Sequence, residues 1–396
     1  MELSRRTSSF QESVIREMTR LGDETGSVNL SQGLPEIEPP QEILISAIEA
    51  IRSGENQYTF PFGSFSFRHA IAEKYLRDNA MTVDPETEVT ATCGVSEAIA
   101  STIFALTEPG DEVIIFEPWY ENYVPDCIMA GVTPVFVPLL EPGYEIDFER
   151  LNDSITSKTR LLLLNNPHNP TGKVFSESEL IKIADQCISH DIIAVTDEIY
   201  EYIYYDGFQP VSLGSLPGMA ERTVTISGLG KTFSLTGWRV GWAVAQANIS
   251  RLIRKVHDYL TVCAPAPFQA AGVTALNLPA SYYDELRQKY AACRAVFTEP
   301  LRMAGFQFVE PSGAYYIMAN YSGIEWDKPG VNETGLKTNS RLFAEFMATK
   351  IGVAVVPGSS FYYENKGEIS TVRFNFAKKP ETLEEAVKRI SKIRRL

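Results

Sequence analysis

Short apolar runs alternate with amphipathic patterns between about residues 88 and 245. The apolar runs are rich in strand-forming residues and are bounded by Pro, Gly or Asn, which predicts strands at 88–92, 112–116, 133–139, 160–165, 191–197 and 222–227. Because these runs are apolar throughout, we expect both faces of their sheet to be covered.

The helical patterns carry their own start signals. Ser176 and Glu179 fit a capping box, and the apolar residues that follow keep to one stripe, so a helix joins two of the predicted strands. This order of strand, helix and strand predicts a mostly parallel α/β sheet, in which ligands gather at the carboxyl ends of the strands. Thr382 and Glu385 predict a second capping box at the start of the last helix.

Composition and charge narrow the class of protein. At 396 residues the chain is expected to hold two domains, or a large domain with a smaller one. The 36 Lys and Arg against 50 Asp and Glu leave a net charge of −14, the wrong sign for binding nucleic acid or an anionic membrane.

The five cysteines form no CxxC pair and the four histidines have no metal-ligand spacing, so neither disulfides nor a metal site is expected. With no signal peptide and no apolar run of about 18 residues, we expect a cytoplasmic protein.

The most unusual window is 227–241, in which four glycines surround Lys231 and the other charged residue is Arg239. Lysine is normally solvated, but burial among glycine and aromatic residues would lower its pKa and make its amine a nucleophile toward a carbonyl. A surface lysine in a glycine-rich turn explains the window equally well. Other candidate sites must decide between these interpretations.

Further polar groups follow the predicted strands. Asn169 lies in an Asn-Pro-Thr-Gly turn after the strand at 160–165, where it is either an ordinary turn residue or an amide fixed at the sheet edge. Asp197 ends the next strand, with Tyr200 three residues on. This carboxylate is either a helix cap or a buried anion that needs a cationic partner, such as a protonated pyridine nitrogen. The segment 94–96 begins a helix, where free backbone N–H groups can hold a phosphate.

Taken together, these residues resemble the class I/II aminotransferases, the fold type I enzymes that use pyridoxal 5′-phosphate (PLP). The matching motifs are Gln-Gly-Leu-Pro at 32–35, Tyr58, 94–96, Asn-Pro-Thr-Gly at 169–172, Asp197, Tyr200, the lysine window, Pro357-Gly358 and Arg373. The chain looks most similar to the branch that acts on kynurenine, glutamine and aromatic amino acids. The resemblance implies a large PLP-binding domain at 46–285, with a mostly parallel sheet covered by helices. It also implies a smaller α/β domain made of 1–45 and 286–396.

The resemblance implies a role for each matching residue. Lys231 would form the Schiff base and move the proton, Asp197 would keep the pyridine nitrogen protonated, and Tyr200 would hydrogen-bond the phenolic oxygen together with Asn169. Tyr120 would stack on the ring, and phosphate would be bound by Gly94, Val95, Ser96, Ser227, Arg239 and, from the other subunit of a homodimer, Tyr58. Substrate would be bound by Gly33, Leu34, Asn169 and Arg373, with Arg373 clamping the α-carboxylate. Ser227 departs from the family pattern, because a phosphate-binding serine often stands where this chain has Gly228.

The implied activity is transfer of an amino group from an L-amino acid to a 2-oxo acid, in a homodimer with a shared active site. A PLP-dependent β-eliminating C–S lyase is the alternative with the same cofactor, and a regulatory domain without turnover is the alternative from another class. The stretch 259–276 has no basic residue for a second carboxylate, so we expect a neutral or aromatic amino donor. Aromatic residues agree with this expectation, although such residues also form ordinary cores: Phe60, Phe62, Trp119, Tyr120 and Tyr123. The segment 322–338 is expected to be a long loop.

Overall fold

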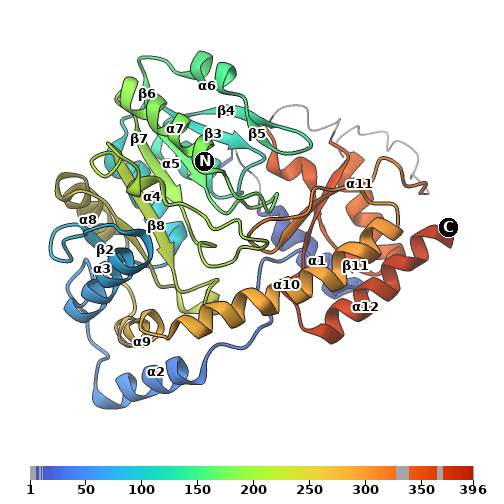
Figure 1. The fold of residues 1–396 in the computed structure, drawn as a ribbon, viewed down its shortest axis with the longest axis horizontal. Helices are drawn as coiled ribbons and strands as arrows, with labels where there is room; N and C mark the ends of the chain where they lie inside the picture. Colours follow the sequence, from blue (N-terminus) through green and yellow to red (C-terminus); the bar gives the residue numbers. More distant parts are fainter. Residues whose placement is uncertain (1–5, 9, 11, 327–338, 364–368, 396) are drawn as a thin grey trace, which may run out of the picture.

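A computed structural model describes residues 6–8, 10, 12–326, 339–363 and 369–395 (Figure 1). Its largest sheet has eight strands in the order β2-β9-β8-β7-β6-β3-β4-β5. These are β2 (Val89–Thr92), β3 (Glu112–Glu117), β4 (Thr133–Leu140), β5 (Glu145–Ile146), β6 (Thr159–Asn165), β7 (Ile193–Asp197), β8 (Thr223–Gly228) and β9 (Gly241–Val244). The five strands from β8 to β4 pair in parallel, whereas β9 is antiparallel to β8 and β2, and β5 to β4. The predicted, mostly parallel α/β sheet is confirmed.

Helices cover both faces of this sheet. Side chains alternate between the two faces along each buried strand, so neighbouring residues of one strand belong to different core clusters. Val113 and Leu161 belong to one core cluster, with residues of α4 (Val95–Leu106), α5 (Tyr123–Ala130) and α8 (Ala247–Thr261). Ile114 and Leu162, one position along, belong to another cluster, with α6 (Phe148–Ser154) and α7 (Glu177–Ser189). Beside β2 and β9 pack α2 (Gln41–Ser53), α3 (Phe65–Asn79) and α9 (Ala266–Leu276).

The two predicted capping boxes have different outcomes. Ser176 caps α7 as expected, with its hydroxyl and the Glu179 carboxylate bonded reciprocally to backbone N–H groups. The second prediction is wrong, because α12 (Pro380–Ile390) begins earlier, at Pro380, a residue whose fixed φ suits the first helical position. Thr382 therefore lies inside the first turn, where its hydroxyl donates to Glu36 Oε2 at 2.8 Å.

A smaller layer is built from both ends of the chain, and it lies to one side of the large sheet in Figure 1. It contains the antiparallel sheet β10-β13-β12 and the parallel pair β1-β11. Its elements are α1 (Val14–Thr25), β1 (Val28–Asn29), α10 (Ala280–Met303), β10 (Tyr316–Asn320), α11 (Asn339–Phe346), β11 (Val353–Ala354), β12 (Val356–Pro357), β13 (Thr371–Asn375) and α12 (Pro380–Ile390). Short helical turns lie at Leu213–Ser215, Thr236–Trp238, Met347–Ile351, Gly358–Phe361 and Ser391–Arg395.

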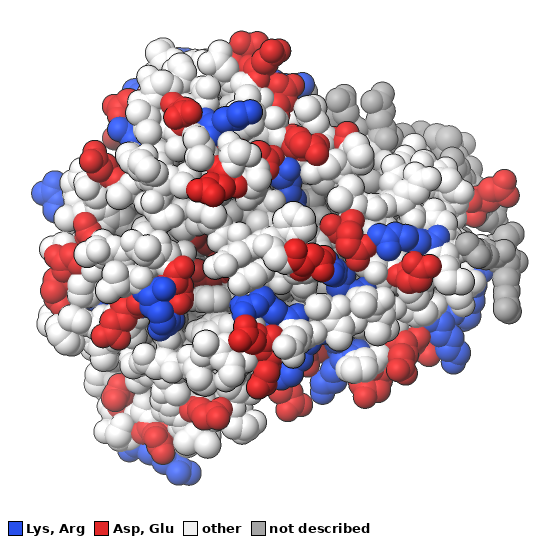
Figure 2. Space-filling model, in the orientation of Figure 1, with Lys and Arg blue, Asp and Glu red and all other residues white. Residues whose placement is uncertain are grey.

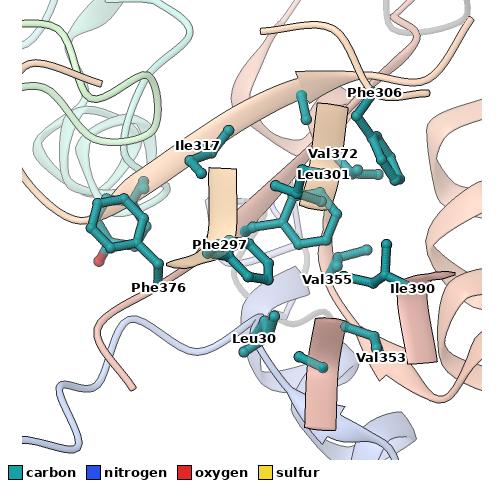
Figure 3. Packing of buried hydrophobic residues seen from close by; sticks show 14 of the residues in the cluster. Leu30, Phe297, Leu301, Phe306, Ile317, Val353, Val355, Val372, Phe376 and Ile390 are labelled. Atoms are coloured by element: carbon teal, nitrogen blue, oxygen red, sulfur yellow. The ribbon is translucent and has the colours of Figure 1, made fainter. Parts of the chain in front are cut away.

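The core of the smaller layer joins segments that are far apart in sequence. Figure 3 shows Leu30 beside Val353 and near Phe297 and Ile390, and all four are buried in one cluster. The N-terminal segment is therefore held by the C-terminal part of the chain, which is the arrangement expected for the small domain. The limits given for the two domains, 46–285 against 1–45 and 286–396, stay a prediction.

Three other expectations concern the surface and the loops. On the face seen in Figure 2, Lys and Arg are scattered among Asp and Glu. None of the described helices is both long and apolar enough to cross a membrane. Of the predicted loop at 322–338, residues 322–326 are free of helix and strand, and the remainder lies outside the described residues.

Candidate active site

A cavity of about 550 Å³ opens at the carboxyl ends of β6 and β7, where these strands end in Asn165 and Asp197. The N-terminal segment and the smaller layer complete its wall. Twelve of the residues predicted from the sequence line it: Gly33, Leu34, Gly94, Val95, Ser96, Tyr120, Asn169, Asp197, Tyr200, Lys231, Arg239 and Arg373. The structure thus brings together motifs that lie up to 340 residues apart, from Gly33 to Arg373.

Lys231 lies in this wall just beyond β8, with its amine enclosed rather than solvated. Its Nζ donates to the backbone oxygen of Gly33 at 2.8 Å. Burial lowers the pKa of Lys231, and the guanidinium groups of Arg373 and Arg239 lower it further, against the opposing effects of Tyr316 and Asp197. Of the two interpretations of this lysine, the enclosed amine with a lowered pKa is the one that the structure supports.

Asp197 is buried at the end of β7, with 4% of its surface exposed. The Tyr123 hydroxyl donates to its Oδ2 at 2.8 Å, and the amide of Ile199 donates to its Oδ1 at 3.2 Å. Burial raises the pKa of Asp197 to about 6, although these two hydrogen bonds and Lys231 act in the opposite direction. No helix begins at this residue in the described chain, so the helix-cap interpretation is wrong. Asp197 is a buried carboxylate, and a cationic partner would favour its ionised form.

Two asparagines organise the neighbouring strand end. Asn165 Oδ1 accepts from the backbone N–H of Asn169 at 2.6 Å, and Asn165 Nδ2 donates to the backbone oxygen of Asp197 at 2.8 Å. Asn169 Oδ1 in turn accepts from Arg373 Nη1 at 2.9 Å. Since its carbonyl oxygen is engaged in this way, Asn169 keeps its NH₂ group available as a donor.

Arg373 is fully buried on β13. Its Nη2 donates to the backbone oxygen of Ser31 at 2.7 Å, and its guanidinium lies 4.4 Å from the centre of the Tyr316 ring. Its Nε is buried without a hydrogen-bond partner among the described residues. An unsatisfied donor on a buried guanidinium is costly, and a bound carboxylate would remove that cost.

The start of α4 and Arg239 form a cradle for an anion. The cap residue Gly94 has φ 86° and offers no side chain to the first turn of the helix, whose N–H groups have no intrahelical acceptors. A Cβ on Gly94 would lie 2.6 Å from Arg239 Nη2, so only glycine allows this close approach. Gly241 faces the same constraint, because its Cβ would lie 2.8 Å from the Gly94 carbonyl carbon.

Two predicted residues are absent from the described wall of the cavity. Ser227 is buried with its hydroxyl donating to Glu201 Oε1 at 2.7 Å, so the predicted phosphate contact is at odds with the structure. The alternation along β8 explains this, since Val224 and Ile226 face one helix layer and Ser227 faces the other way. Tyr58 is 79% exposed in the single chain, away from the described wall of the cavity.

Tyrosines near the cavity include groups that the sequence did not identify. Tyr200 is buried, and its hydroxyl lies 2.9 Å from that of Tyr316. Tyr120 meets Tyr123 edge to face, with 5.6 Å between ring centres. Tyr123 had been considered only as a substrate-side aromatic residue, whereas its hydroxyl binds Asp197. Asn165 could have been found from its place at the end of a buried strand, but nothing in the sequence pairs Tyr123 or Tyr316 with its partner.

Comparison with known proteins decides the family. The model of the family "Aminotransferase class I and II" matches residues 25–390. The chain belongs to this family. A kynurenine–oxoglutarate transaminase of Dictyostelium discoideum is 36% identical to this chain, and the match covers 99% of this chain and 96% of that protein. An aromatic-amino-acid aminotransferase 2 of Thermococcus litoralis is 34% identical, and the match covers 99% of this chain and 98% of that protein. The solved structure of N-succinyldiaminopimelate aminotransferase from Mycobacterium tuberculosis superposes with a TM-score of 0.93 at 36% identity, covering 99% of this chain and 100% of that one.

The chain is therefore a PLP-dependent transaminase of fold type I. Its cavity fits this cofactor in three respects. The Gly94 and Arg239 cradle suits a phosphate, the enclosed Lys231 amine suits an aldehyde, and the buried Asp197 carboxylate suits a protonated ring nitrogen.

Proposed function

We propose that this aminotransferase holds PLP on Lys231 and transfers the amino group of a neutral or aromatic L-amino acid to a 2-oxo acid. The observation that carries the proposal is that one cavity joins the Lys231 amine, the Asp197 carboxylate and the guanidinium groups of Arg239 and Arg373. When bound, PLP supplies the electron sink and carries the amino group between the two half-reactions.

Lys231 and Asp197 divide the proton chemistry between them. Because burial lowers the pKa of Lys231, more of its amine is unprotonated at neutral pH and able to take and return a proton. Asp197 is held by Tyr123 and the Ile199 amide, so a negative charge there keeps the ring nitrogen protonated. The Tyr200 hydroxyl and the NH₂ group of Asn169, which both line the cavity, would hold the phenolic oxygen of the cofactor.

The phosphate and the substrate carboxylate bind at separate cations. Arg239 and the backbone of Gly94, Val95 and Ser96, which line one part of the cavity, would hold the phosphate, and Tyr120 would contact the ring. Arg373 binds the α-carboxylate of the substrate, oriented by Asn169 and Ser31. Gly33 and Leu34, from the N-terminal segment, cover the substrate.

The apolar part of the cavity wall supports the proposal of a neutral or aromatic amino donor. Ile15, Leu34, Tyr120 and Tyr316 line it, and the relatives named above include enzymes for kynurenine and aromatic amino acids. The other aromatic residues considered from the sequence lie elsewhere: Trp119 packs near Phe136, and Phe60 near Phe62. Tyr120 alone of that set supports the proposed donor by its place in the described wall.

The proposal of a homodimer is supported by large apolar side chains that are exposed to water in the single chain. These include Tyr58 at 79%, Phe60 at 66%, Phe65 at 60% and Tyr259 at 94% exposure. Large apolar side chains that are this exposed are typical of a protein interface. In the dimer, Tyr58 reaches the phosphate in the partner's cavity. The five free cysteines support a reducing compartment such as the cytoplasm.

The test is a comparison of wild type, Lys231→Ala and the surface control Lys255→Ala. Wild type and the control should bind a yellow chromophore that borohydride fixes to the protein, and should transfer amino groups to 2-oxo acids. Lys231→Ala should lose both properties. A wild-type protein that takes up no PLP would overturn the proposal.

A panel of amino donors tests the substrate class. Aromatic and neutral donors should give the highest kcat/KM, whereas a strong preference for aspartate would contradict the proposed donor. Release of pyruvate and ammonia from cysteine conjugates without a 2-oxo acid would show that β-elimination competes with transfer.

A further inference from the structure

The segment 30–34 passes beside the cavity without belonging to a helix or a strand. Its first residue, Leu30, is anchored in the core of the smaller layer (Figure 3). Its last three residues, Gln32, Gly33 and Leu34, line the cavity. Because the segment has no regular structure of its own, its backbone oxygens depend on donors from other parts of the chain.

Asn375, on β13, supplies three of these donors. Its backbone N–H donates to the oxygen of Leu30 at 2.9 Å, and its Nδ2 donates to the oxygens of Gln32 at 2.7 Å and Leu34 at 3.3 Å. The orientation of the side-chain amide is fixed, because its Oδ1 accepts from the N–H of Ala377 at 2.8 Å. Asn375 is fully buried, so these contacts are made away from competing water.

The two oxygens between these positions are bound by groups of the cavity wall. Arg373 Nη2 donates to the oxygen of Ser31 at 2.7 Å, and Lys231 Nζ donates to that of Gly33 at 2.8 Å. Asn375 therefore holds alternate residues of a segment whose remaining oxygens contact the amine and the guanidinium of the proposed site.

We propose that Asn375 is a positioning residue for substrate binding, which fixes the segment 30–34 and through it the orientation of the Arg373 guanidinium. This inference rests on the proposed function, which places the α-carboxylate of the substrate at Arg373. The two side chains lie two residues apart on β13 and therefore project from the same face of the strand. Arg373 keeps its bond to Ser31 only while the segment stays in place.

Loss of the Asn375 amide would release the oxygens of Gln32 and Leu34 and let the segment move. The guanidinium of Arg373 would then lose one of the two acceptors that orient it, and only Asn169 Oδ1, at 2.9 Å, would remain. A misplaced guanidinium binds a carboxylate less well, because paired hydrogen bonds require a fixed geometry. The phosphate cradle, built from Gly94 and Arg239 on other elements, should keep its geometry.

The experiment compares the kinetics of the wild-type holoenzyme and two variants, with one neutral amino donor and pyruvate. Asn375→Ala removes the amide without adding a charge, and Asn375→Asp keeps the shape and the acceptor for Ala377 but loses the donor. In both variants KM for the amino donor should rise about tenfold, whereas kcat should stay within about threefold. Thr371→Val is the matched control, because Thr371 is buried on the same face of β13 and its hydroxyl has no hydrogen-bond partner among the described residues. The control should keep the wild-type KM and kcat.

A PLP titration of the apoproteins separates positioning from a general structural role. Both Asn375 variants should bind PLP within about twofold of the wild type, since the proposed effect is confined to the substrate carboxylate. A PLP dissociation constant that rises in proportion to KM would overturn the inference, and so would an unchanged KM in both variants. Transamination by the wild type would stand in either case. A wild-type protein that transfers no amino group would overturn the proposed function and this inference with it.

Discussion

Replacing Tyr123 by phenylalanine removes one hydroxyl from the proposed cofactor site and keeps the aromatic ring. That hydroxyl donates to Asp197 Oδ2 at 2.8 Å, and both side chains are buried. The Ile199 amide would remain on Oδ1 at 3.2 Å. The substitution therefore takes one of two donors from a carboxylate that is proposed to hold the protonated ring nitrogen.

The size of the effect follows from the strength of that bond. A hydrogen bond to a charged group contributes about 1.5–3 kcal/mol, which corresponds to about one to two pH units in a pKa. Burial raises the pKa of Asp197 to about 6 in the wild type, so its value in the variant should be about 7–8. At pH 7 much of the carboxyl group is then neutral, and PLP should bind about tenfold more weakly or worse. The difference in PLP affinity between the wild type and the variant should be smaller at pH 8.5, where Asp197 is mostly ionised in both proteins.

The measurement is a PLP titration of the apoproteins between pH 6.5 and 8.5, followed by the cofactor absorbance. Tyr283→Phe is the matched control, because Tyr283 is also buried and its hydroxyl has no hydrogen-bond partner in the described structure. This control should bind PLP like the wild type at every pH. An unchanged affinity and pH dependence in Tyr123→Phe would refute the role given to this hydroxyl.

Three further substitutions test other buried charges. Lys74→Met leaves the Glu201 carboxylate, whose side chain is 9% exposed, without its amine partner, so the free energy of unfolding should fall by about 3–5 kcal/mol, seen as a lower Tm. Burial raises the pKa of Asp126 to about 7, so ionisation destabilises the fold as pH rises from about 4 to 7; Asp126→Asn should raise Tm at pH 8 but not at pH 4. His257 contacts Glu97 near the start of α4, and His257→Gln should raise the PLP dissociation constant about twofold to fivefold by leaving that anion unbalanced near the phosphate.

The sheet was predictable because its physics is local to each strand. A strand that is covered on both faces has to be apolar throughout, and β3 and β6 carry that signature in their own residues. The polar residue at a strand end is equally visible, which is how Asp197 was found. The α7 cap was predictable for the same reason, since both members of its capping box lie within one turn.

Contacts between distant segments could not be predicted in this way. Tyr123 and Asp197 are 74 residues apart, and only the packing of α5 beside β7 brings them together. The family resemblance implied a phosphate contact for Ser227 although it stands one place from the usual serine, and its side chain alternates away from the cavity toward Glu201.

The net charge of −14 makes the arrangement of cations in the cavity the decisive feature for anion binding. The protein as a whole repels a phosphate or a carboxylate, so affinity has to come from groups that are already in position. Arg373 meets this requirement because Asn169 and the Ser31 backbone orient it before any substrate arrives, and the Tyr316 ring lies beneath it. Arg239 meets it through the space that Gly94 leaves open.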